Sequence, residues 1–164
     1  MNSFLNTAYQ DLLAVAAARR EAYAKGNPFP HLSFPDFFNP VMLEEVLAEF
    51  PDLASLDTIR YNNPNEKKFA SRGESEMGPK TLSFIHFLNS APFLEFLQAL
   101  TSIEETLLGD PYLVGGGLHE IKRGGLLKVH ADFNKHTRTG LDRRLNVLVY
   151  LNKEWKDEYG GHFE

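Results

Sequence analysis

The 164-residue sequence contains no cysteine. Disulfide bonds, thiolate catalysis, iron–sulfur clusters and cysteine-ligated zinc are therefore excluded, and any metal must be held by histidine and carboxylate side chains. Long hydrophobic runs are also missing, since no stretch approaches the roughly 20 apolar residues of a membrane span. The N-terminus lacks the basic start and apolar stretch of a signal peptide. We therefore expect no membrane association and a cytoplasmic location.

A basic excess is missing as well. Lys and Arg number 17 against 22 Asp and Glu, which makes the net charge −5. Nonspecific nucleic-acid binders need a clear positive excess to displace counterions from phosphates, so no nucleic-acid partner is expected. The 43% hydrophobic and 24% charged content is close to globular averages. The length corresponds to one domain of about 100–200 residues, so a single domain is expected over residues 1–164.

The N-terminal part of the chain has helical patterns. Residues 4–25 are rich in Ala, Leu and Arg and contain neither Gly nor Pro, which favours a helix. Asn39 is a good N-cap with Pro40 at the first helical position, and Pro51 stops the helix that follows. These signals predict two helices separated by an extended Phe- and Pro-rich segment.

A further helical region begins at Ser90, where apolar residues recur at helical spacing. Ser102, with Glu105 three residues later, has the pattern of a capping box that opens another short helix. Residues 58–78 are polar and show no clear period. Residues 1–110 are thus predicted to be mainly helical.

The C-terminal part changes to strand patterns. Residues 118–122 and 126–132 flank the turn signal Arg-Gly-Gly at 123–125, which predicts a β-hairpin. Residues 145–151 (LNVLVYL) form the strongest strand pattern in the chain, apolar enough to be covered on both faces.

One histidine has a spacing suited to metal binding. Among the six histidines, only His130 has a carboxylate two residues later, at Asp132. Residues i and i+2 of a strand point to the same face, about 6.6–6.8 Å apart along the backbone, so both side chains can reach one ion. A distant second His would complete the 2-His-1-carboxylate triad of nonheme Fe(II) oxygenases. The alternative is an exposed strand-end pair without a function.

The order of short motifs around this pair carries a family resemblance. Gly-Gly at 124–125 precedes HAD at 130–132, and RRLNVLVYLN at 143–152 is followed by Trp155 and by Gly-Gly at 160–161. This arrangement resembles the prolyl-hydroxylase-like family of 2-oxoglutarate- and Fe(II)-dependent oxygenases. The upstream stretch PHLSFPDFFNPVMLEEVLAEFP is similar to the opening strand and helix of that family. The resemblance extends from about Phe29 onward.

The resemblance implies an α+β fold. N-terminal helices would pack on a double-stranded β-helix, a cupin-like jelly roll, and residues 111–164 would form the first half of its core. The distal histidine and the basic residue that anchors 2-oxoglutarate lie past the second Gly-Gly strand in this family. Both would fall beyond Glu164, so the chain is interpreted as a truncated fragment, inactive by itself and incomplete at its C-terminus.

The resemblance also assigns residues. His130 and Asp132 would be two of the three Fe(II) ligands. Tyr150 stands where some relatives place a tyrosine that hydrogen-bonds the distal carboxylate of 2-oxoglutarate. On a strand Asn146 would share its face and could contribute a second polar contact. Leu127 stands where many prolyl hydroxylases have a tyrosine, a departure from their cosubstrate pocket.

The implied reaction is oxidation of a C–H bond by O2, coupled to decarboxylation of 2-oxoglutarate to succinate and CO2. Ascorbate is a further candidate cofactor, and a prolyl residue of a protein or peptide is the substrate class that the resemblance favours. Two alternatives remain open: a non-catalytic binding module on the same fold, and a cupin-like metal enzyme that does not use 2-oxoglutarate. Binding of the metal and of the cosubstrate distinguishes the three.

The remaining polar residues near the motif have weaker signals. His119 could line the cavity that would contain the metal pair, although a structural role fits it better. His136 lies in a polar loop that is either solvated or a lid. Arg143 and Arg144 could steer an acidic cosubstrate or form a solvated strand end. His162 is a tempting third ligand, but in the family pattern its position opens a middle strand and does not bind the metal.

Overall fold

A computed structural model describes residues 3–161 of the chain. The residues form two compact units, which we call the helical unit and the sheet unit. The helical unit comprises the chain up to Phe50 together with Met77–Pro111, and the sheet unit comprises Pro51–Glu76 together with the residues from Tyr112 on. The segment from Pro51 to Glu76, which the sequence places in the mainly helical part, is thus grouped with the C-terminal residues.

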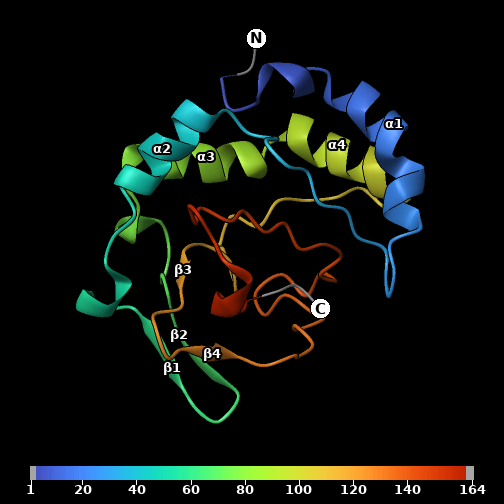
Figure 1. The fold of residues 1–164 in the computed structure, drawn as a ribbon. Coiled ribbons are helices and arrows are strands. Elements are labelled where there is room, and N and C mark those ends of the chain that lie inside the picture. The colour runs from blue at the N-terminus through green and yellow to red at the C-terminus, as the bar shows by residue number, and fades with distance from the viewer. Residues whose placement is uncertain (1–2, 162–164) are drawn as a thin grey trace. The chain divides into compact units, whose positions relative to one another are not determined.

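The described residues of the helical unit form four α-helices. In chain order they are α1 (Leu12–Ala24), α2 (Pro40–Ala48), α3 (Pro79–Leu88) and α4 (Ala91–Thr101), preceded by a 3₁₀ turn at Thr7–Tyr9 (Figure 1). Helix α1 packs along α4, and α2 packs against α3. The predicted cap of α2 is confirmed, because the Asn39 side-chain oxygen accepts from the amide of Val41 at 3.0 Å with Pro40 in the first turn.

Two features at the other helices differ from the sequence prediction. Helix α3 is not among the helices predicted from the sequence. Its N-cap is Gly78, which has no side chain to accept a hydrogen bond from the first amides of the helix. The predicted capping box at Ser102 and Glu105 is wrong. Ser102 instead ends α4 with a left-handed backbone (φ 58°), and its amide donates to the carbonyl of Gln98. The left-handed conformation stops the helical hydrogen-bond series, and no α-helix follows within the described part of the chain.

Phenylalanine rings form the core of the helical unit. The ring of Phe37 stacks on that of Phe96 with centroids 5.5 Å apart, and Phe4 stacks on Phe87 at 4.8 Å. Helices α3 and α4 contribute five large buried residues: Phe84, Phe87, Phe93, Phe96 and Leu100. Burial of these rings removes a large apolar area from water and also sets specific ring geometries.

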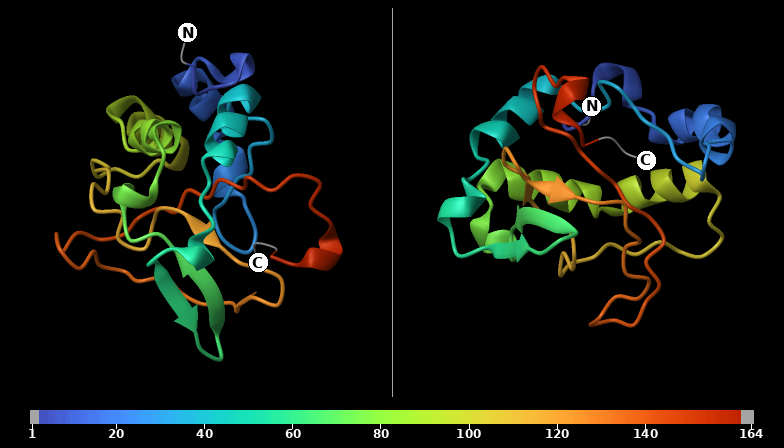
Figure 2. Two further views of the ribbon diagram at one scale, coloured as in Figure 1. Left: turned by 90° about the vertical axis from the view of Figure 1, so that its left-hand side faces the viewer. Right: turned by 60° about the horizontal axis from the view of Figure 1, so that its bottom comes forward.

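The sheet unit is built on a hairpin from the polar segment that showed no clear period. Strands β1 (Ile59–Asn62) and β2 (Glu66–Ala70) form an antiparallel hairpin (Figure 2). Ile59 is paired with Ala70. Asn63 forms the turn, because its side-chain oxygen accepts from the amides of Asn65 and Glu66. An asparagine at this position closes the chain reversal with its own side chain.

The other edge of β2 pairs with two short strands. Strand β3 (His119–Glu120) lies opposite Phe69 and Ala70, and β4 (Leu126–Leu127) lies opposite Glu66 and Lys67. The prediction of a hairpin between 118–122 and 126–132 is therefore wrong. The two strands follow one another along β2, and the residues between them loop out at the Arg-Gly-Gly turn. Gly125 permits this, since a Cβ there would lie 2.9 Å from the Lys67 carbonyl oxygen.

The strand predicted at residues 145–151 is not present in the structure, and the strand predicted at 126–132 is limited to Leu126–Leu127. A strand requires a neighbour for its ladder of hydrogen bonds, and no described segment pairs with 145–151. The described residues thus combine helices with one small antiparallel sheet, which is compatible with an α+β fold, but a double-stranded β-helix is not confirmed. No helix among residues 3–161 has the length and apolarity needed to cross a membrane.

Candidate metal centre

The structure brings His130 and Asp132 together, although not on a strand. Both lie in irregular chain just after β4, and their side chains are about two-fifths exposed. The distance from His130 Nε2 to Asp132 Oδ1 is 3.5 Å. The carbonyl oxygen of Lys128 lies 2.7 Å from His130 Nδ1. The i, i+2 spacing therefore brings the two groups together without the regular strand that was expected to position them.

The contact at Nδ1 determines which ring nitrogen of His130 is available. A carbonyl oxygen can only accept a hydrogen bond, so Nδ1 carries the proton. In the neutral ring Nε2 then presents its lone pair toward Asp132 Oδ1. In that state the two acceptors repel each other unless a proton or a metal ion lies between them. Two metal–ligand bonds of about 2.0–2.2 Å each span the observed 3.5 Å, so the pair fits one metal ion.

The other oxygen of Asp132 is held by two side chains from the following segment. Asn146 Nδ2 donates to Asp132 Oδ2 at 2.5 Å, and the Arg143 guanidinium lies 3.3 Å from the same oxygen. Arg143 also donates to Asn146 and lies over the ring of Phe133, 4.4 Å from its centroid. These contacts fix the carboxylate so that Oδ1 remains directed at His130, the arrangement that outer partners give to metal-binding carboxylates.

The same neighbours determine the protonation of Asp132. Partial burial by itself raises the pKa of this carboxyl. The hydrogen bond from Asn146 and the electrostatic effects of Arg143, His130 and Lys68 together outweigh that effect, and the pKa lies below its usual value. The carboxylate is therefore ionised at neutral pH, as a metal ligand must be.

Lys68 of β2 is a residue near this site that sequence reasoning missed. Its side chain is only 13% exposed, its ammonium group lies 3.4 Å from Glu66, and it sits over the Tyr61 ring at 4.8 Å. Its positive charge acts on both Asp132 and His119. The pKa of His119 is lowered first by desolvation and then by Lys68, which favours a neutral imidazole. No local motif could reveal Lys68, because β2 is far from the HAD segment in sequence.

The other predicted residues have different surroundings. Tyr150 exposes 61% of its surface. Asn146, predicted to contact 2-oxoglutarate, uses its amide nitrogen on Asp132. His136 accepts hydrogen bonds at Nδ1 from the amides of Arg138 and Thr139 and so stabilises its own turn. His162 lies outside the described residues.

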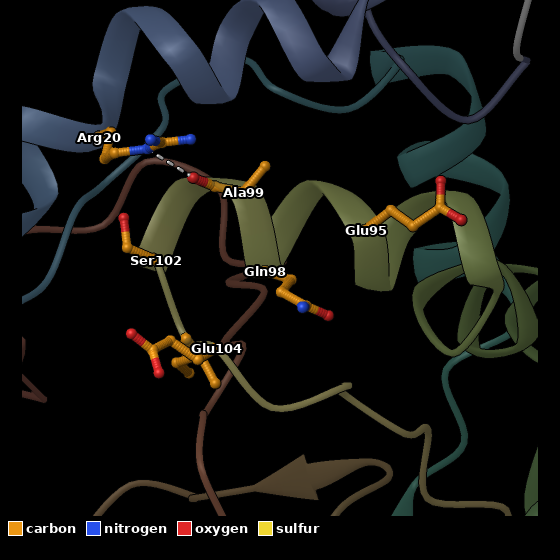
Figure 3. Close-up of a pocket in the computed structure, with 7 residues that line it drawn as sticks. Arg20, Glu95, Gln98, Ala99, Ser102 and Glu104 are labelled. Atoms are coloured by element: carbon orange, nitrogen blue, oxygen red, sulfur yellow. Dashed lines mark hydrogen bonds between the residues drawn. The ribbon is translucent and has the colours of Figure 1, made fainter.

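Within the described part of the chain, no third metal ligand lies beside His130 and Asp132. No group of three His, Asp or Glu side chains there is arranged to hold a metal ion. An open hollow in the helical unit is lined by Arg20, Glu95, Gln98 and Glu104, among others, and no imidazole is among the residues that line it (Figure 3). Its Arg20 donates to the Ala99 carbonyl at 2.9 Å and so ties α1 to the end of α4.

Comparison with known families gives a match that spans the HAD segment. Residues 116–164 match the model of the 2OG-Fe(II) oxygenase superfamily, whose description names both Fe(II) and 2-oxoglutarate. The prolyl-hydroxylase-like subfamily is not confirmed by this match. Comparisons with curated proteins and with solved structures gave no match. The match includes His130 and Asp132, and at a coarse level it supports an oxidoreductase that uses Fe(II), 2-oxoglutarate and O2.

Proposed function

We propose that this protein is, or is part of, a 2-oxoglutarate- and Fe(II)-dependent oxygenase in which His130 Nε2 and Asp132 Oδ1 bind the iron. The observation that carries the proposal is the pair of acceptor atoms facing each other at 3.5 Å within the segment that matches the superfamily. An imidazole and a carboxylate are two of the three protein ligands in the facial triad of these enzymes.

The chain's own residues position and charge this pair. The Lys128 carbonyl holds the His130 ring so that Nε2 is directed at Asp132, and Asn146 and Arg143 orient the Asp132 carboxylate. Bound Fe(II) would supply the activation of O2 that is coupled to decarboxylation of 2-oxoglutarate to succinate and CO2. The protein's part is to bind the ion, keep the ligands deprotonated and orient the reacting groups.

The charges around the pair suit a dianionic cosubstrate. Arg143 and Lys68 both act electrostatically on Asp132, so two cations lie near a metal site that has one carboxylate. Because Lys68 is also paired with Glu66, Arg143 and a bound metal ion would supply most of the attraction for 2-oxoglutarate. We retain Tyr150 and Asn146 as proposed contacts of the cosubstrate and a prolyl residue of a protein or peptide as the proposed substrate class.

Metal binding by the 164-residue chain tests the proposal. Mn²⁺, a redox-stable stand-in for Fe²⁺, is titrated into the chain and followed by electron paramagnetic resonance. We expect binding that is lost in His130→Ala and in Asp132→Asn and retained in His31→Ala, which removes an imidazole from the helical unit. Unchanged Mn²⁺ binding in both His130→Ala and Asp132→Asn would refute the assignment of the ligands.

Calorimetric titration with 2-oxoglutarate separates the alternatives. The oxygenase proposal predicts cosubstrate binding that requires the metal. Metal binding without 2-oxoglutarate binding would instead indicate a cupin-like metal enzyme, and binding of neither would indicate a non-catalytic module. Succinate release with Fe²⁺ and O2 is expected to be absent for the 164-residue chain, and robust release would show that this chain supplies the third ligand itself.

A further inference from the structure

A second groove in the sheet unit has a composition unlike the rest of the molecule. Its volume is about 300 Å³, and it runs over β1 and β2 to the turn at Arg123–Gly125. Its lining contains five cationic residues and no acidic one: Arg60, Lys67, Lys68, Lys122 and Arg123. The whole chain has more acidic than basic residues, with a net charge of −5. This concentration of cations is therefore a local feature that the composition does not explain.

Some of these cations are already neutralised and others are available. Lys122 contacts Asp52 at 2.6 Å and Glu120 at 3.8 Å, and Lys68 contacts Glu66 at 3.4 Å. Among the described residues, neither Lys67 nor Arg123 has an ion-pair partner. These two residues supply the free positive charge of the groove.

Arg60 is held in place without losing its charge. Its guanidinium donates to the carbonyl of Ala54 at 2.7 Å and lies 5.7 Å from the centre of the Phe69 ring. Neither partner is anionic, so the charge remains available, and an arginine that is already ordered loses little conformational freedom when it binds an anion.

Two cations of the groove lie on the opposite face of the sheet from the candidate metal centre, whereas Lys68 borders both regions. Paired residues of neighbouring antiparallel strands point to the same face of a sheet. Arg60 is paired with Phe69, and Asn62 with Lys67, so these four residues share one face. Lys68 and His119 belong to the opposite face, since Lys68 alternates with Lys67 and His119 is paired with Ala70. The groove cations Arg60 and Lys67 therefore lie on the other side of the sheet from the residues that act on Asp132.

We propose that this groove is a docking site for an acidic segment of a polypeptide, one that carries several Asp or Glu side chains. Arg60, Lys67 and Arg123 would bind its carboxylates by charge-assisted hydrogen bonds. Strand β1 pairs only with β2 among the described strands, so its other edge has free backbone groups that a peptide can hydrogen-bond by strand addition. A nucleic acid cannot use that edge in this way. The net negative charge of the chain also disfavours a long polyanion.

Fluorescence anisotropy with the full 164-residue chain tests the site. The probe is a labelled octapeptide of glutamate, compared with an octapeptide of glutamine and with an eight-nucleotide oligothymidylate. We expect the glutamate peptide to bind most tightly, with an affinity that falls as salt is added. The double variant Lys67→Ala/Arg123→Ala should weaken binding by about tenfold, because two free charges are lost.

A matched control removes the same charge elsewhere. Arg19→Ala/Lys25→Ala changes two exposed cations on and next to α1, in the helical unit, and should leave peptide affinity within about twofold of the parent. Circular dichroism of both double variants verifies that the chain remains folded. The proposal is overturned if the two double variants weaken binding equally, if the glutamine peptide binds as tightly as the glutamate peptide, or if oligothymidylate binds more tightly than either. None of these measurements depends on metal or 2-oxoglutarate, so the oxygenase proposal can fail while this one stands.

Discussion

At the scale of single residues, the orientation of the two proposed metal ligands depends on neighbouring groups that are not ligands themselves. His130 and Asp132 lie in irregular backbone and are partly exposed, so the surrounding fold fixes their rotamers only weakly. The carbonyl of Lys128 orients one of them, and Asn146 with Arg143 orients the other. Outer contacts of this kind reduce the freedom that ligands would otherwise lose on binding an ion.

Asn146→Ala tests this dependence. It removes the amide that donates to Asp132 Oδ2 and leaves both proposed ligands in place. We expect Mn²⁺ affinity to fall by about 10–100-fold, the usual effect of losing an outer partner. Asn152→Ala, an exposed change in the same segment, is the control and should leave the affinity unchanged. Equal affinities of Asn146→Ala and the parent chain would show that Asn146 does not position the carboxylate.

At the scale of elements, a long-range carboxylate takes the place of a local helix cap. Gly78 precedes α3 and has no side chain to satisfy the first amides of the helix. Glu49, which follows α2, accepts from the amides of Lys80 at 2.9 Å and Thr81 at 3.0 Å. A Cβ at Gly78 would lie 2.4 Å from Glu49 Oε2, so the glycine leaves room for this carboxylate. A negative group at a helix N-terminus also complements the helix dipole.

A double-mutant cycle tests the cap. Gly78→Ala should lower the melting temperature because it displaces the Glu49 carboxylate, although the backbone of Gly78 (φ −72°) suits alanine. Glu49→Ala should lower it as well. The double variant should lose less than the sum of the two single losses, because both act through one contact. Additive losses in thermal unfolding would contradict the shared mechanism.

The pH dependence of this cap follows from Glu49. Desolvation raises the pKa of its carboxyl, but the hydrogen bonds from Thr81 and Lys80 outweigh that effect, so the pKa is lowered in the folded chain. The stabilisation is therefore fully present above the unfolded-state pKa of about 4.3 and is lost as the pH falls through the folded pKa. The melting temperatures of the parent chain and Glu49→Ala should differ at pH 7 and converge in acid.

At the scale of the whole molecule, burial is unevenly distributed between the two units. The buried large residues are concentrated in the helical unit, and after Pro111 Leu118 is the one buried residue of the described chain. Val129, Leu148 and Tyr150 each expose more than half of their surface. Hydrophobic stabilisation is proportional to the apolar area removed from water, so most of it belongs to the packing of the helices.

Phe96→Ala tests where that stabilisation resides. Phe96 is 2% exposed and packs against Phe34, Phe37 and Phe93. Its loss should cost about 3–5 kcal/mol in the free energy of unfolding, measured by urea titration of the helical circular dichroism signal. Val41→Ala, at a position that is 68% exposed on α2, should change it by less than about 0.5 kcal/mol. A small effect of Phe96→Ala would show that the phenylalanine core is not the main source of stability.

The sequence by itself determined the local features. The cap at Asn39, the helix after Ser90 and the proximity of His130 and Asp132 all follow from contacts within a few residues, and such contacts are visible in a sequence. The lack of cysteine likewise limited the metal ligands to histidine and carboxylates.

Only the tertiary structure decided which strands pair and which distant residues meet. The hairpin signal at 123–125 could not show that β2 was available as a partner for both β3 and β4. The apolar pattern at 145–151 measures a preference for strand, but a strand also requires a neighbour. Lys68 near Asp132, Glu49 at the start of α3 and the cationic groove all join segments far apart in the chain. Such contacts form through chain folding in space, and the local periodicity of a sequence carries no record of them.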